Sequence, residues 1–265
     1  MPQPANLDTN DSPLAGRTAL VTGGARRIGR AIALQLAANG ANVAITYRNS
    51  QPEAEDLVRA LSAFGVDAFA VRTELTDAES IRQSVASVVE EFGQLDLLVN
   101  NAGHFESAAL ETITAEQWDQ VFAINTRAPF LVAQAAYPHL RAAKDGDGGR
   151  IINIGSLGGL HPWATHAHYC ASKAALHMLS QTMAKAWAPE VSVNSVAPGM
   201  IELAGTASES EVQSEAGSPY AHFAAKTPMQ RNGTAEDVAA AVLFFATGPH
   251  FITGQLLAVD GGLGL

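Results

Sequence analysis

Short apolar runs alternate with longer segments of helical spacing along most of this 265-residue chain, and this alternation is what most constrains its fold. The first run, residues 17–21, stops at the glycine turn 22–24, and Ile28, Ile32 and Leu36 then recur at helical spacing. A strand, a glycine turn and a helix in this order begin a βαβ unit. The chain is therefore predicted to form an α/β fold, in which a parallel sheet is covered by helices on both faces.

The alternation continues to the carboxyl end and predicts a Rossmann-like, doubly wound sheet of seven strands. Strands are expected at residues 17–21, 42–47, 66–71, 95–99, 150–154, 191–196 and 253–259. Helices are expected at residues 26–39, 53–64, 77–92, 114–143, 167–187 and 234–246, the last with Thr234 as its N-cap. At this length the fold is normally one domain, assigned to residues 16–265 after a mobile tail at residues 1–15. Within it, residues 200–225 are expected to form a mobile substrate lid.

Composition narrows the classes of partner. The chain carries 26 acidic and 16 basic residues, a net charge of −10, which argues against nucleic acid or an anionic membrane as the main partner. The single cysteine, Cys170, allows no internal disulfide and fits a reducing compartment. No apolar run approaches the length of a membrane span, and the N-terminus lacks the features of a signal peptide. We therefore expect a cytoplasmic protein that acts on a small molecule.

The first glycine turn and the end of the second strand are the candidate cofactor site, because ligands of such sheets bind beyond the strand carboxyl ends. Residues 23–29 open a helix whose backbone N–H groups suit a pyrophosphate. They do not match G-x-G-x-x-G, so an ordinary strand-to-helix turn is an equally good interpretation of this segment alone. The second strand ends in residues 47–50 without an acidic side chain, and Arg48, with Arg26, offers charge-assisted hydrogen bonds to a 2′-phosphate. This predicts NADP(H), unless Arg48 is only a solvated surface arginine.

Tyr169 and Lys173 are the candidate acid–base pair. Four residues apart, they lie on one face of a predicted helix, and a nearby ammonium is expected to lower the pKa of a phenol from its usual value of about 10. A phenol tuned in this way is a general acid or base. Ser156, at the end of a buried strand, could meet the tyrosine over a substrate. The alternative is an ordinary amphipathic helix that happens to carry both residues.

Three histidines, His161, His166 and His168, precede the tyrosine. No second group of metal-binding residue types accompanies them, so no metal is predicted. They are candidates for lining the substrate pocket instead, and residues 104–107 are expected to shape the same pocket.

Taken together, the motifs resemble the short-chain dehydrogenase/reductase family from about residue 15 to the carboxyl end. The matching residues are Thr22-Gly23 with Gly29, Asn100-Asn101-Ala102-Gly103, Asn125, Ser156, Tyr169 with Lys173, Pro198-Gly199, and Thr253-Gly254 before Asp260-Gly261-Gly262. Arg27 departs from the pattern, because it stands where the family usually has a glycine. The pair Arg26-Arg27 and the run 47–50 resemble the pteridine-reductase-like branch, whereas Ser156 replaces an Asp that is frequent there.

The resemblance implies a role for each catalytic residue. Ser156 would hydrogen-bond a substrate carbonyl oxygen, and Tyr169 would exchange a proton with it while a hydride passes to or from a nicotinamide. Lys173 would lower the pKa of Tyr169 and bind the nicotinamide ribose. Asn125, interrupting a long helix, would hold a water of a proton relay. Its alternative is local bonding to the backbone.

The strand ends and the resemblance together assign the cofactor contacts. They are Gly23, Arg26, Arg27, Ile28, Gly29, Tyr47, Arg48, Asn49, Ser50, Glu74, Leu75, Asn101, Ala102, Gly103, Tyr169, Lys173, Pro198, Gly199 and Ile201.

The expected function is NADPH-dependent reduction of a carbonyl, or the reverse oxidation of an alcohol. Thioesters of 3-oxoacyl groups, ketones, sugars and pterins all remain open as substrates. The alternative is a catalytically silent NADP-binding regulator of the same fold. The resemblance also implies a homotetramer, paired through the faces of helices 114–143 and 167–187.

Overall fold

Seven parallel strands form one sheet in the computed structural model, which describes residues 12–143, 148–202 and 219–265. The strand order is β3-β2-β1-β4-β5-β6-β7. Because β1 pairs with both β2 and β4, the order reverses there, and the switch point of the sheet lies between β1 and β4. The strands are β1 (Thr18–Val21), β2 (Asn42–Tyr47), β3 (Ala68–Arg72), β4 (Leu97–Asn100), β5 (Gly149–Ile154), β6 (Val191–Pro198) and β7 (Leu256–Val259).

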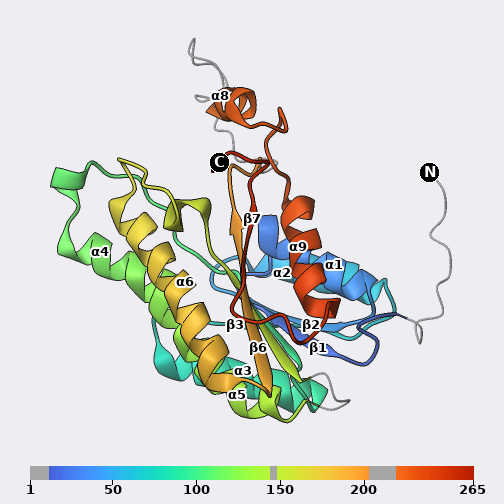
Figure 1. Ribbon diagram of the computed structural model, residues 1–265. Helices are drawn as coiled ribbons and strands as arrows, with labels where there is room; N and C mark the ends of the chain where they lie inside the picture. The colour runs from blue at the N-terminus through green and yellow to red at the C-terminus, as the bar shows by residue number, and fades with distance from the viewer. Residues whose placement is uncertain (1–11, 144–147, 203–218) are drawn as a thin grey trace.

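Helices cover both faces of this sheet (Figure 1). The α-helices are α1 (Arg27–Ala38), α2 (Gln51–Ser62), α3 (Ala78–Phe92), α4 (Ala115–Phe122), α5 (Ala128–Arg141), α6 (Ala167–Trp187), α8 (Pro219–Lys226) and α9 (Ala235–Thr247). Short 3₁₀ turns, η2 (Leu110–Thr112) and η4 (Leu157–Gly159), and a π turn, η3 (Ala123–Arg127), complete the described elements. No described helix is long and apolar enough to cross a membrane.

Two apolar cores explain why the strands read as continuous apolar runs. Side chains of β1 alternate between them: Ala19 and Val21 face the core under α1 and α9, and Leu20 faces the core under α3, α5 and α6. All three are fully buried. Burial on both faces is the general reason why parallel strands lack a polar face. The predicted doubly wound, seven-stranded sheet is confirmed, and its rigid frame fixes the carboxyl ends of the strands at one edge.

The long helix predicted at residues 114–143 is interrupted where Asn125 had suggested a break. Thr114 begins α4 with a capping box to Gln117, and α4 then passes through the π turn η3 into α5. Such π turns occur mostly as single-turn insertions in α-helices, frequently at functional sites. Thr234 caps α9 in the same way as Thr114 caps α4, as predicted. The expected strand 253–259 is shorter, because β7 begins only at Leu256.

The structure describes only parts of the predicted tail and of the predicted lid. Residues 1–11 of the tail and 203–218 of the lid lie outside the described residues. Leu14 is 4% exposed within the core under α1, and its N–H donates to the carbonyl of Asn39 at 3.0 Å. The packed part of the chain therefore begins before residue 16, where the domain was predicted to start.

Candidate active site

A cleft of about 710 Å³ opens at the carboxyl ends of the central strands. Every residue predicted to contact the cofactor lines it, as do Ser156, Tyr169 and Lys173, while Asn125 lies fully buried behind it. The other lining residues lie one or two positions from predicted residues in the sequence. This closeness is the signal by which they could have been predicted. They are Ala25, Thr46, Thr73, Ile124, Ile154, Gly155 and Trp163.

The first glycine turn is packed so closely that only glycine fits at key positions. A Cβ atom on Gly29 would lie 2.5 Å from both Asn101 Nδ2 and the carbonyl oxygen of Gly23. The amide of Asn101 donates to the carbonyls of Thr22 (2.9 Å) and Gly23 (3.1 Å) and so ties the end of β4 to this turn. The turn runs into the amino end of α1, where free backbone N–H groups suit a phosphate. The geometry fits the pyrophosphate of a dinucleotide.

Arginines surround the far end of the cleft. Arg26 pairs with Glu53 at 3.6 Å, whereas no carboxylate of the described residues pairs with Arg48, which is exposed. Arg72 holds the backbone at this point, because its Nε donates to the carbonyl of Arg48 at 3.1 Å. Glu74, predicted as a cofactor contact, lines the cleft, but its carboxylate accepts hydrogen bonds from Thr76 in its own loop. This end therefore presents positive charge that suits a 2′-phosphate.

Tyr169 and Lys173 meet near Ser156 at the other end. The Lys173 Nζ atom is buried, donates to the carbonyl of Ile154 at 2.8 Å, and lies 5.9 Å from the centre of the Tyr169 ring. The hydroxyl of Ser156 accepts a hydrogen bond from the N–H of Gly158 at 3.0 Å. The helix spacing and the strand end thus bring the three predicted catalytic groups together.

The pKa of Tyr169 differs from the prediction. Burial raises it to about 12, and the hydroxyl of Ser156 acts against this rise. Burial also lowers the pKa of Lys173 to about 8. The expectation that Lys173 lowers the pKa of Tyr169 is therefore wrong for the protein by itself. Desolvation disfavours both charged forms, and the ammonium is directed to the Ile154 carbonyl instead of the phenol.

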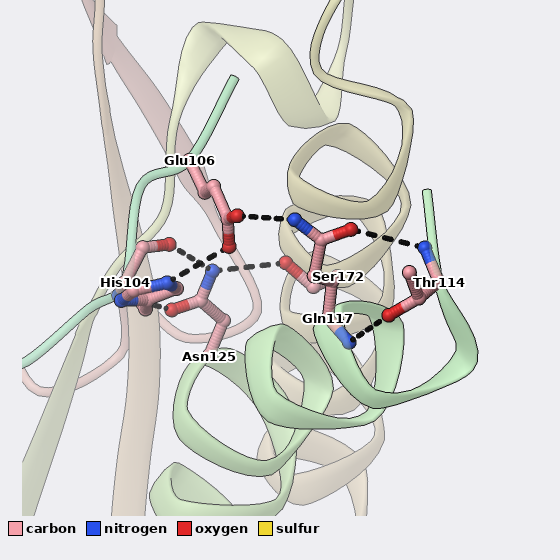
Figure 2. Close-up of polar contacts among 6 residues, drawn as sticks. All are labelled: His104, Glu106, Thr114, Gln117, Asn125 and Ser172. Atoms are coloured by element: carbon pink, nitrogen blue, oxygen red, sulfur yellow. Dashed lines mark hydrogen bonds and ion pairs between the residues drawn. The ribbon is translucent and has the colours of Figure 1, made fainter. Parts of the chain in front are cut away.

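Asn125 uses its side chain to join the cleft wall to α6 (Figure 2). Its Oδ1 accepts from the N–H of His104 at 2.7 Å, and its Nδ2 donates to the carbonyl of His104 at 2.9 Å and to the hydroxyl of Ser172 at 3.0 Å. Ser172 in turn donates to the carbonyl of Tyr169 at 2.7 Å. The π turn thus positions both the loop after β4 and the turn of α6 that carries the tyrosine. The predicted water-binding role stays a prediction.

His177 is a site residue that sequence reasoning missed. Its Nε2 accepts the N–H of Ser156 at 3.4 Å, and its ring fills the space beside Gly155, where a Cβ atom would lie 2.0 Å away. Burial, and then the charge of Lys173, lower the pKa of His177 to about 4, so the ring is neutral at pH 7. The available signal was its spacing, one helical turn after Lys173 on the same face of α6.

The three histidines before Tyr169, which were candidates for lining the substrate pocket, are not among the described residues that line the cleft. Among the described residues, no group of three His, Cys, Asp or Glu side chains is placed to hold a metal ion. His166 stacks on the ring of Phe105, with 4.6 Å between ring centres, while His168 is fully buried.

The sheet with its switch point and the glycine cradle define a Rossmann-type, dinucleotide-binding α/β protein, and comparisons with known proteins narrow this class. A family model described as enoyl-(acyl carrier protein) reductase matches residues 23–264. The 3-oxoacyl-[acyl-carrier-protein] reductase FabG of Staphylococcus aureus is 37% identical over 249 residues, which cover 93% of this chain and 98% of that protein.

Versicolorin reductase 1 of Dothistroma septosporum is 34% identical over 268 residues, covering 97% of this chain and 99% of that protein. The crystal structure of a short chain dehydrogenase from Burkholderia cenocepacia in complex with NADP superposes with a TM-score of 0.85. It is 39% identical, and the match covers 96% of this chain and 100% of that one. The chain therefore belongs to the short-chain dehydrogenase/reductase family, and it is an oxidoreductase.

Proposed function

We propose that the protein is an NADPH-dependent carbonyl reductase that also catalyses the reverse oxidation of an alcohol. The observation that carries this proposal is the arrangement of one cleft. Its far end has the glycine cradle and Arg48, and its near end holds Tyr169 beside Ser156 and Lys173. The NADP bound to the related Burkholderia cenocepacia enzyme supports the choice of cofactor. The lining of the cleft by all of the predicted cofactor contacts also supports the proposal.

The residues divide the chemistry of reduction between them. Ser156 orients the carbonyl by hydrogen bonding to its oxygen, and Tyr169 donates the proton that this oxygen gains. The nicotinamide of the cofactor, when bound, supplies the hydride to the carbonyl carbon. With a pKa of about 12, Tyr169 is protonated at neutral pH and is therefore ready to act as the acid. Its phenolate regains a proton from solvent, with Lys173 as the nearest cation, and Asn125 holds the surrounding backbone.

The reaction is tested by following NADPH oxidation with a panel of 3-oxoacyl thioesters, ketones, sugars and pterins. Wild type should consume NADPH with at least one of these substrates. Tyr169→Phe should lower kcat by about 100-fold or more while leaving the Kd for NADPH within about twofold, because only the proton donor is lost. Near-normal turnover by this variant would refute the mechanism. Binding of NADPH without turnover on any substrate would instead favour the silent regulator.

The proposal also covers the oligomeric state of the protein, its cellular location and its substrate lid. We propose a homotetramer, which is supported by apolar side chains exposed on both flanks of the sheet. A cytoplasmic location remains our expectation. Residues 200–225 are proposed as the lid, and Ile201 anchors its first part, because it is buried and pairs with Gly233.

A further inference from the structure

Two loops beside Tyr169 carry aromatic rings that the proposed chemistry does not use. The ring of Phe105, after β4, lies perpendicular to the Tyr169 ring, 4.8 Å between centres, although the residue is 61% exposed. Trp163, before α6, lies nearly parallel to the same ring, 6.0 Å away and tilted by 14°. Both residues line the cleft. The reactive phenol is therefore bordered by aromatic surface.

The position of Phe105 is fixed from both sides. The N–H and carbonyl of His104 are both bonded to Asn125, and the carboxylate of Glu106 accepts from Gln117 at 2.6 Å (Figure 2). Glu106 also contacts the ring of His104 at 3.3 Å. Gln117 is itself held by the capping box of α4. The exposed phenyl ring thus stands on an ordered loop, a preorganised surface for a ligand.

The second loop is joined to the first. The N–H of Ala108 donates to the carbonyl of Thr165 at 2.9 Å, and His166 stacks on Phe105, 4.6 Å between centres and tilted by 21°. Trp163 in turn packs over Gly158, where a Cβ atom would lie 3.2 Å from its ring. Together Phe105, Trp163 and His166 form one cluster, which we name the aromatic wall.

The distribution of positive charge along the cleft bears on whether the substrate is anionic or neutral. The arginines of the described cleft lining, residues 26, 27 and 48, all belong to the cofactor end. The remaining cation, Lys173, is buried against the Ile154 carbonyl. The described residues near Tyr169 therefore present no cation to a carboxylate or phosphate group of a substrate. A neutral planar ring, in contrast, gains offset or edge-to-face contacts from exposed aromatic side chains.

We propose that the aromatic wall selects carbonyl substrates whose C=O group is attached to a planar aromatic ring. The carbonyl lies between Ser156 and Tyr169, and the ring packs against Phe105 and Trp163. This inference rests on the proposed reductase function and names the substrate class of the same site.

The test compares two ketones of the same carbon skeleton, acetophenone and cyclohexyl methyl ketone, with saturating NADPH. Wild type should show a kcat/KM about fivefold to tenfold higher for the aryl ketone, which is the range expected from aromatic contacts. Phe105→Leu and Trp163→Leu should each reduce this ratio to about twofold or less, mainly through KM. Their kcat/KM for the saturated ketone should fall less than their kcat/KM for the aryl ketone.

Trp118→Leu is the matched control, because Trp118 is also a partly exposed aromatic residue, stacked on Phe122 in α4 outside the cleft lining. It should leave the ratio unchanged. A wild-type ratio near one, or a ratio unaffected by both wall variants, would overturn the inference.

A fluorescence measurement of ketone binding tests the aromatic wall even if the proposed reductase function is wrong. If wild type reduces neither ketone, binding is measured as quenching of the fluorescence that Trp163→Leu removes. Stronger quenching by acetophenone than by its saturated analogue supports the aromatic wall without turnover. Equal or absent quenching by the two ketones refutes it.

Discussion

At the scale of single residues, Arg48 is the side chain on which cofactor choice depends most directly. It is exposed at the end of β2, and among the described residues no carboxylate neutralises it. Arg48→Asp should therefore raise the Kd for NADPH by about 10- to 100-fold, the loss of one charge-assisted hydrogen bond with added repulsion. The Kd for NADH should change little or improve, because an acidic residue there suits a ribose 2′-hydroxyl.

Titration calorimetry with both nucleotides measures this change. Arg59→Asp, which reverses a charge on the exposed face of α2 outside the cleft lining, is the control and should leave both constants unchanged. Equal NADPH affinity in wild type and Arg48→Asp would show that Arg48 is only a solvated surface arginine.

His177 makes the stability of the folded protein sensitive to acid. Its folded-state pKa is about 4, below the value near 6.5 expected when it is unfolded, so the unfolded chain binds the proton more readily. Its contribution to the free energy of unfolding is therefore complete above about pH 6.5 and is lost as the pH falls toward 4. His177→Gln, whose amide also accepts the N–H of Ser156, should flatten this part of the pH profile.

Urea unfolding between pH 4 and 7 provides the measurement. His222→Gln, which changes an exposed histidine of α8, should keep the wild-type slope. The same slope in wild type and His177→Gln would contradict the assignment of this pH dependence to His177.

At the scale of elements, Arg27 adopts a disfavoured backbone conformation where the turn after β1 enters α1. Arg27 has φ 54°, in the left-handed region, whereas its neighbour Arg26 is extended at φ −142°. The left-handed region strains a residue that has a Cβ atom by about 1–2 kcal/mol, and glycine removes this strain. Glycine also loses more conformational entropy on folding, which offsets about 0.5–1 kcal/mol of the gain. Arg27→Gly should thus raise the free energy of unfolding by roughly 0.5–1 kcal/mol.

The paired control is Arg26→Gly, which relieves no strain and should lower the free energy of unfolding slightly. Urea unfolding of both variants distinguishes the two positions. A loss of stability in Arg27→Gly as large as in Arg26→Gly would show that the turn is not strained. If Arg27→Gly also binds NADPH more weakly, the guanidinium of Arg27 contributes to cofactor binding in spite of the backbone strain.

The elements that the sequence allowed us to predict are those whose signals are local. Apolar runs buried on both faces located the strands, and Asn125 marked the interruption of a long helix, now seen as a π turn. The strand order β3-β2-β1-β4 depends on contacts between distant segments, so it was not predicted from the sequence. The spacing of Tyr169 and Lys173 likewise gave their common helix face.

What the sequence could not supply is the environment of each group. The pKa of Tyr169 was predicted in the wrong direction, because burial depends on chain segments far from the tyrosine in sequence. His177 was missed, because its contact with Ser156 joins α6 to the end of β5. The aromatic wall likewise arises where two loops meet, so neither loop predicts it alone.

At the scale of the whole molecule, several exposed apolar side chains lie on elements at opposite flanks of the sheet. One set lies on α4, α5 and α6, and the other on α9, β7 and the loop between them, on the opposite flank of the sheet (Figure 1). The side chains are Trp118, Phe130 and Met178 in the first set, and Phe244, Phe251 and Leu257 in the second. We propose that each set forms a self-complementary surface, because two distinct surfaces of this kind on one subunit generate a tetramer with three perpendicular two-fold axes.

Light scattering on wild type at micromolar concentration should therefore give the mass of four 27.7 kDa chains. Met178→Asp on α6 and Phe244→Asp on α9 each place a charge in one surface only, so each should yield dimers, because the other interface persists. The double variant should be a monomer. Phe64→Asp, at an exposed phenylalanine just after α2, should remain a tetramer. A monomeric wild type would refute the proposed tetramer. If one single variant is a monomer, only one interface holds the subunits together.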